Sequence, residues 1–166
     1  METSYKFKYI EKNLLSLFSL ICGNQNISKY VYYLNDDPLS SNEVQVDLLS
    51  EGYYFLTFFD GSIPEQEKIR IFLNPMYGDF KNYPLSNIAY SIEIVVPINY
   101  WVLHGRAEIR PIRILDEISQ MIDQQKVAGI TEVEITKFRS GRISNSNYCV
   151  FSAEIIINSS SMKGLR

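Results

Sequence analysis

The stretch PIRILDEISQMIDQQK, residues 111–126, is the clearest structural signal in the chain. Pro111 suits the first turn of a helix, where its missing N–H costs nothing. Gly129 then allows the chain to leave the helix. Apolar residues recur every three or four positions, which predicts an amphipathic helix with one buried stripe. The residues of this stripe are Ile112, Leu115, Ile118, Met121 and Ile122.

Two stretches after this helix change to a period of two, which is typical of β-strands. They are residues 131–137 and 148–157. The polar stretch 139–147 separates them and predicts a long hairpin loop. The chain after the helix therefore predicts a C-terminal antiparallel hairpin.

The sequence before the helix contains three more candidate strands. Residues 90–96 and 68–73 alternate cleanly between apolar and other side chains. Residues 53–59 are apolar at nearly every position, which favours a central strand that is covered on both faces. Residues 74–84 are rich in Gly, Pro, Asn and Tyr and predict a loop.

Helical spacing returns near the N-terminus. Residues 5–23 predict a long amphipathic helix that ends at Gly23-Asn24. Ser28 is a candidate cap for a second, short helix, which the polar stretch 35–38 would end.

These elements predict an α+β fold. A mainly antiparallel sheet of about five strands would be packed by the N-terminal helix and the helix 111–126, which precedes the C-terminal hairpin. The chain has 166 residues, of which 46% are hydrophobic, so it can bury one core without disulfides. We expect a single domain over 1–166, with a flexible tail at 159–166.

Charge and composition exclude several classes of protein. The net charge of −3 disfavours a protein that grips duplex DNA over a large surface. Cys22 and Cys149 both lie in apolar stretches, which indicates buried thiols in a protein made in the cytoplasm. The sequence shows neither a secretory signal nor a run of 18 apolar residues, so we expect no membrane contact.

Catalytic motifs are missing as well. The sequence has no phosphate-binding loop, no dinucleotide-binding turn and no nucleophile elbow. His104 is the one histidine and is interpreted as structural or surface-exposed. Glu132 and Glu134 share one face of their predicted strand, but Lys137 points to the other, which is the wrong arrangement for a metal-dependent nuclease. We therefore expect no catalytic residues, no metal and no cofactor, and a protein that is not an enzyme.

Two groups of basic residues and one aromatic loop are the candidate contact surfaces. The basic groups would be ordinary solvated charge, paired with neighbours such as Glu108, or they would contact an acidic protein or passing nucleic acid. The aromatic loop 74–84 would pack on its own core or form a subunit contact. The basic residues are Arg106, Arg110 and Arg113, then Lys137, Arg139 and Arg142; the aromatic-loop residues are Met76, Tyr77, Phe80 and Tyr83.

The order of elements in the second half resembles a known class of protein. This half resembles small head–tail joining proteins of tailed bacteriophages, of the tail-terminator, tail-completion or neck-ring type. The resemblance rests on a strand, a Trp-containing connection, a helix entry and a break before the final hairpin. The corresponding stretches are SIEIVVP (91–97), WVLHG (101–105), IRPIRILDEI (109–118) and VAGIT (127–131).

The resemblance implies a structural protein of the virion, made in the host cytoplasm and located at the neck or the top of the tail. Such proteins form rings, commonly sixfold, that end the tail tube and join it to the head. The implied partners are further copies of the chain in a hexamer, the tail tube, head-side neck or portal-associated proteins, and DNA that passes through the lumen without sequence-specific binding. The alternative is a non-enzymatic binding or adaptor module whose basic patches contact nucleic acid or an acidic protein.

Overall fold

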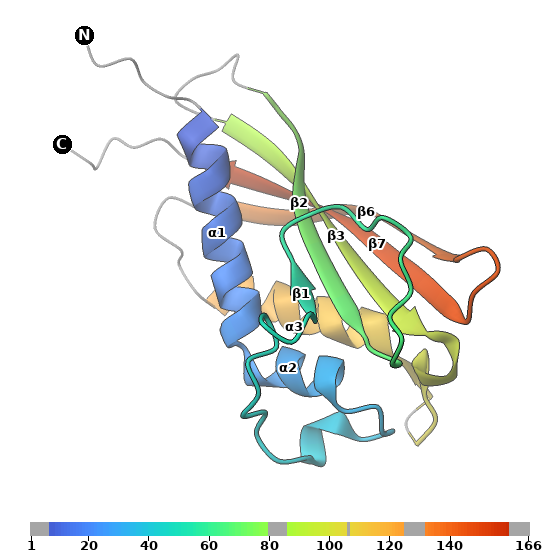
Figure 1. Cartoon of the computed structure of the whole chain (residues 1–166). Helices are drawn as coiled ribbons and strands as arrows, with labels where there is room; N and C mark the ends of the chain where they lie inside the picture. The colour runs from blue at the N-terminus through green and yellow to red at the C-terminus, as the bar shows by residue number, and fades with distance from the viewer. Residues whose placement is uncertain (1–6, 80–85, 106, 125–131, 160–166) are drawn as a thin grey trace, which may run out of the picture.

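Three helices and a five-stranded sheet form the framework of the computed structural model (Figure 1). The model describes residues 7–79, 86–105, 107–124 and 132–159. The α-helices are α1 (Phe7–Gly23), α2 (Gln25–Tyr32) and α3 (Arg110–Gln124). The strands of the main sheet are β1 (Tyr54–Phe55), β2 (Arg70–Asp79), β3 (Ser86–Pro97), β6 (Glu132–Arg142) and β7 (Tyr148–Ser159). Short elements complete the order: η1 (Pro38–Ser40), η2 (Ile98–Tyr100), β4 (Val102–Leu103) and β5 (Glu108–Ile109).

The strand order in the main sheet is β1-β2-β3-β7-β6. All neighbouring strands are antiparallel except β1 and β2, which run parallel. β4 and β5 form a separate antiparallel pair that leads into α3. The predicted α+β class with a mainly antiparallel sheet of about five strands is confirmed.

One face of the sheet, called the inner face below, packs against the helices. Alternate residues of β2, β3 and β7 point to this face, and they join apolar side chains of all three helices in one core. Ile71, Ile94 and Phe151 represent the strands, and Ile21 and Ile118 represent the helices. Figure 1 shows the β6–β7 hairpin projecting beyond this helical layer.

A smaller apolar cluster lies on the opposite, outer face of the sheet. Phe72, Val95 and Tyr148 form its buried part, and Phe55 and Phe59 cover it. The ring of Phe55 stacks on that of Phe72, with the centroids 4.7 Å apart. The segment between β1 and β2 thus covers part of the outer face.

This cover explains why the predicted central strand at 53–59 is wrong. Only Tyr54 and Phe55 pair with β2, and they do so at the edge of the sheet. The chain then leaves the sheet, and the ring of Phe59 packs on that of Phe72 over the outer face. The dense apolar pattern is used for covering a sheet face and not for a buried strand.

Both predicted loops are shorter than expected because the neighbouring strands run on. β2 continues from the predicted strand to Asp79, so the part of the expected loop 74–84 that the model describes is strand. β6 continues to Arg142, so the expected loop 139–147 shrinks to the turn at 143–147. Backbone pairing with β3 and β7 extends both strands through polar sequence that carries no alternating pattern.

Helices α2 and α3 lie close to their predicted positions, but the residues at their starts have other roles than predicted. Asn24, not Ser28, caps α2: its Oδ1 accepts the Ile27 N–H at 3.0 Å. In α3, Ile112 is exposed and Ile114 is buried in its place. Ile114 lies one turn before Ile118, whereas Ile112 is rotated by about 200° from Ile114 around the helix.

Arg110 starts α3 from a position that is 0% exposed. Its Nε donates to the Tyr100 carbonyl at 2.9 Å, and Nη1 donates to the carbonyls of Tyr30 and Tyr33 at 3.0 and 2.9 Å. Nη2 donates to the Asn35 carbonyl at 2.5 Å. Burial lowers the pKa of this guanidinium to about 10, still far above neutral pH, so the group is charged. The prediction that Arg110 contacts a partner is therefore wrong.

Replacing Arg110 with Met should destabilise the fold strongly. The change keeps a long apolar side chain but leaves four backbone carbonyls without their donor, which should cost about 3–5 kcal/mol of unfolding free energy. Urea denaturation followed by circular dichroism measures this loss. The control is Arg113→Met, which removes only partly exposed ion pairs and should cost about 1 kcal/mol or less. Equal losses in the two variants would contradict the role given to Arg110.

Candidate assembly interface

The first basic group does not form a contact surface in the residues that the model describes. Arg110 is buried, as shown above. Arg113 is half-buried and lies in local ion pairs, with its Nε 3.4 Å from Glu108 and its Nη1 3.1 Å from Asp116. Arg106 lies outside the described residues. For Arg113, the interpretation as local ion pairing is supported.

The second basic group lies on β6, an edge strand of the sheet. We call Lys137, Arg139 and Arg142 the basic edge. From Glu134 to Arg142 every residue is exposed except Thr136, which is half-buried. Within the described ranges, β6 pairs with β7 alone and offers the backbone groups of its other side to a further strand or to solvent. The predicted loop position of Arg139 and Arg142 is corrected to strand.

The cations of the basic edge have few internal partners. The Lys137 ammonium is 3.8 Å from Glu154, but its side chain remains 73% exposed. Arg142 donates to the Ser146 carbonyl at 3.3 Å. Arg139 lines a shallow hollow of about 350 Å³ together with Phe59 and Glu93. Most of the positive charge of this strand therefore faces solvent.

Phe138 adds a large apolar group to the same strand. It lies between Lys137 and Arg139, points to the inner face opposite Ala153 and is 73% exposed. Its ring stacks on that of Phe151, with the centroids 5.7 Å apart and the planes 10° apart. Phe138 was not predicted as a site residue, because the predicted strand ended at Lys137. An edge strand that exposes an aromatic ring on one face and cations on the other has the composition of a protein-binding surface.

Glu154 joins the two halves of the sheet across its outer face. Its Oε1 accepts the hydroxyl of Tyr77 from β2 at 2.7 Å and that of Thr136 from β6 at 2.8 Å. Both strands are irregular beside these donors, between Pro75 and Tyr77 and between Ile135 and Lys137. The Tyr77 hydrogen bond, followed by that of Thr136 and the charge of Lys137, lowers the pKa of Glu154.

Met76 and Tyr77, which were predicted in the aromatic subunit contact, lie on β2. They are 49% and 54% exposed. Tyr77 has an internal role through its hydrogen bond to Glu154, whereas no such bond involves the apolar Met76. Phe80 and Tyr83 lie outside the described residues, so the predicted group of four stays a prediction.

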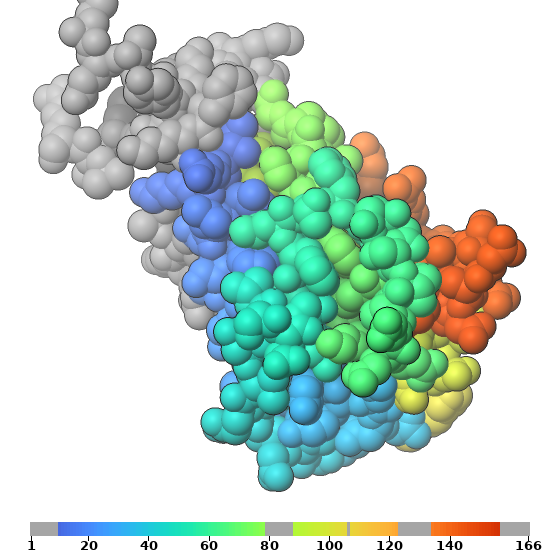
Figure 2. Space-filling view, viewed as in Figure 1, coloured from blue at the N-terminus to red at the C-terminus, as the bar shows by residue number. Residues whose placement is uncertain are grey.

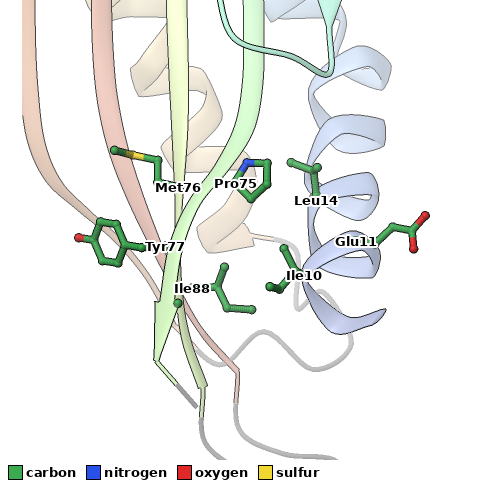
Figure 3. Close-up of a pocket in the computed structure, with 8 residues that line it drawn as sticks. Ile10, Glu11, Leu14, Pro75, Met76, Tyr77 and Ile88 are labelled. Carbon is green, nitrogen blue, oxygen red and sulfur yellow. The ribbon is translucent and has the colours of Figure 1, made fainter. Parts of the chain in front are cut away.

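A groove of about 520 Å³ runs between α1 and the end of β2 (Figure 3). Figure 3 shows Pro75 and Ile88 of the sheet facing Ile10 and Leu14 of α1, whereas Tyr77 points away from the helix. Pro75 fits here because β1 pairs only with Ile71 and Phe72, so this part of β2 lacks a partner on that side within the described chain. The groove lining is mainly apolar, and it offers packing and no chemistry.

The residues with reactive side chains are scattered. No three His, Cys, Asp or Glu side chains gather as a metal site in the described part of the chain. His104 is exposed, and its backbone N–H donates to Asp36 at 3.3 Å. Cys22 and Cys149 are free thiols, both half-buried, and burial raises the pKa of Cys22 to about 11, so this thiol stays protonated at neutral pH.

A protein-family model described as YomW matches residues 24–156, which is more than half of the chain. The chain belongs to the YomW family. The family name comes from an SPbeta-like Bacillus phage and indicates a phage-related protein. The YomW match begins at Asn24, the cap of α2, and ends within β7, so it includes the basic edge and leaves out α1. A search of curated proteins finds no match. Among the described helices, none is both long and apolar enough to cross a bilayer.

Replacing Glu154 with Gln should make the folded protein less sensitive to acid. Because the folded pKa of Glu154 lies below its ordinary value of 4.5, its stabilising effect is present above that pH and is lost as the pH falls through the folded pKa. The melting temperature of the variant should be below that of the wild type at pH 7, and the gap should shrink toward pH 3. Glu134→Gln, an exposed carboxylate on β6, is the control. A difference in melting temperature that is the same at every pH would contradict the role given to Glu154.

Proposed function

We propose that this phage-related protein is a structural component of the virion, a ring-forming tail terminator or neck protein that joins the tail tube to the head. The observation that carries the proposal is the edge strand β6. Its row of exposed side chains, with Lys137 and Arg139 on the outer face and the exposed Phe138 on the inner face, suits binding to other proteins. The membership in a phage-derived family and the order of elements after residue 88 support it further.

In this proposal the protein acts by assembly and carries out no reaction. Copies of the chain bind one another in a closed ring, and the faces of the ring contact the tail tube on one side and head-side neck proteins on the other. DNA passes through the lumen without being held. A closed ring needs two different surfaces on each subunit, because repeated head-to-tail contacts are what generate rotational symmetry.

The alternative function, an adaptor module with two basic patches, has less support from the structure than from the sequence. Arg110 is buried and Arg113 is paired, so the first patch loses two of its three predicted residues. Of the two predicted patches, the basic edge on β6 is the cationic surface that the described residues retain, in a chain with a net charge of −3.

Phage particles that lack this protein should show a defect at the junction of head and tail. The experiment places an early stop codon in the gene within the phage genome and examines the particles by negative-stain electron microscopy. Full heads beside detached or overlong tails are expected. Supplying the wild-type chain from a plasmid should restore joined, infectious particles. Normal particles without the protein would overturn the proposal.

A further inference from the structure

The segment between α2 and β2 is strongly acidic. We call residues 36–67 the acidic segment, which carries eight of the 19 Asp and Glu residues of the chain and contains neither Lys nor Arg. All eight are exposed except Asp37, which is half-buried. They are Asp36, Asp37, Glu43, Asp47, Glu51, Asp60, Glu65 and Glu67.

Two lysines from outside reach this segment. The Lys29 ammonium donates to the Leu39 carbonyl at 3.1 Å, and the Lys68 ammonium donates to the Glu51 carbonyl at 2.9 Å. The Arg70 guanidinium also reaches the segment and donates to Ser62. The segment still keeps an excess of carboxylates on its surface.

The acidic segment also exposes much apolar surface. Val44 and Leu48 anchor it in the core, while Val46 and Leu49 between and beyond them are 38% and 51% exposed. Leu56, Phe58 and Ile63 are exposed further along the segment. Exposed aliphatic and aromatic groups among charges are typical of an interface with another protein.

The acidic segment and the basic edge occupy different sides of the molecule. Figures 1 and 2 show the first part of the segment, in cyan and teal, near α1 and α2, and the orange β6–β7 hairpin on the opposite side. The later part of the segment approaches the hairpin: Phe59 lines the hollow of Arg139, and Glu65, Glu67 and Arg142 line another hollow of about 500 Å³. The chain therefore presents opposite charges on two separate surfaces.

We propose that the acidic segment of one copy binds the basic edge of the next copy. The proposal rests on the proposed ring and names its subunit contact. A two-fold contact made through the basic edge alone would place its cations against those of the second copy, whereas the head-to-tail contact pairs opposite charges at each step. DNA as the occupant of the basic edge would approach a chain with a net charge of −3, in which Glu65 and Glu67 lie beside Arg142.

Apolar groups and charges contribute differently to this contact. Burial of Leu49 and Val46 on one copy and of Phe138 on the other would supply most of the binding free energy. Exposed charge pairs contribute little each, but they orient the partners and disfavour the wrong pairing. Assembly should therefore weaken, without disappearing, as salt screens the charges.

Reversing the charge on either surface should block self-association. The basic-edge variant is Arg139→Glu with Arg142→Glu, and the acidic-segment variant is Glu43→Lys with Glu51→Lys. Glu65 and Glu67 are left unchanged because they lie near Arg142 of the same chain. Asp47 is left unchanged because its Oδ1 accepts the N–H groups of Leu49 and Ser50.

Size-exclusion chromatography with light scattering measures the outcome. The wild-type chain should form oligomers, and each variant should need at least tenfold higher concentration to do so. An equimolar mixture of the two variants should recover dimers, because the intact acidic segment of one variant then meets the intact basic edge of the other. Lys12→Glu and Glu11→Lys, both exposed on α1, are the matched controls and should behave as wild type. Thermal melts that match the wild type show that the variants are folded.

Several results would overturn this contact. They are a wild-type chain that stays monomeric at every concentration, variants that assemble as the wild type does, and a mixture that fails to recover dimers. Loss of duplex DNA binding by the basic-edge variant with unchanged self-association would assign the basic edge to nucleic acid. A monomeric chain whose absence still leaves heads and tails unjoined would remove the subunit contact and leave the proposed function standing.

Discussion

A guanidinium that loses contact with water has to recover its hydrogen bonds within the protein, and Arg110 does so from four backbone carbonyls. Three of these carbonyls, on Tyr30, Tyr33 and Asn35, belong to the last turn of α2 and the residues that follow. The fourth, on Tyr100, belongs to the connection from β3. Arg110 thereby fixes α2 and this connection relative to the start of α3. The helical layer on the inner face depends on this arrangement, and the charge of Asp36 also favours the charged guanidinium.

The outer face is organised by a second polar group, the Glu154 carboxylate. Tyr77 reaches it from one edge of the sheet and Thr136 from the other, each next to an irregularity that turns the side chain toward it. A bulge strengthens local twist and ends regular pairing. β6 and the part of β2 beyond its pairing with β1 are thus held to the centre by side chains where their backbones depart from regular register. This makes β6 a defined surface despite its exposure.

The sequence predicted the features that depend on periodicity and missed those that depend on pairing. The amphipathic helices and the alternating strands were predictable, because a single buried face imposes a regular spacing on the apolar residues. The extension of β6 to Arg142 was not, because an edge strand outside the core has no apolar face to mark it. Arg110 was misassigned for a related reason: spacing places it beside Arg113, but only the fold reveals four carbonyls around one and two carboxylates beside the other.

Edge strands carry charged residues in many monomeric proteins, because a second strand that paired with them would bury the charge of a lysine or arginine. That explanation accounts for Lys137, Arg139 and Arg142 taken alone. It does not account for the exposure of Phe138, whose ring stacks on Phe151 and still stays 73% exposed on the same strand. It also does not account for the acidic segment, which combines apolar exposure with charge of the opposite sign. Cations that repel a copy of the same edge while attracting a different surface explain all three features. They also restrict the chain to head-to-tail contacts.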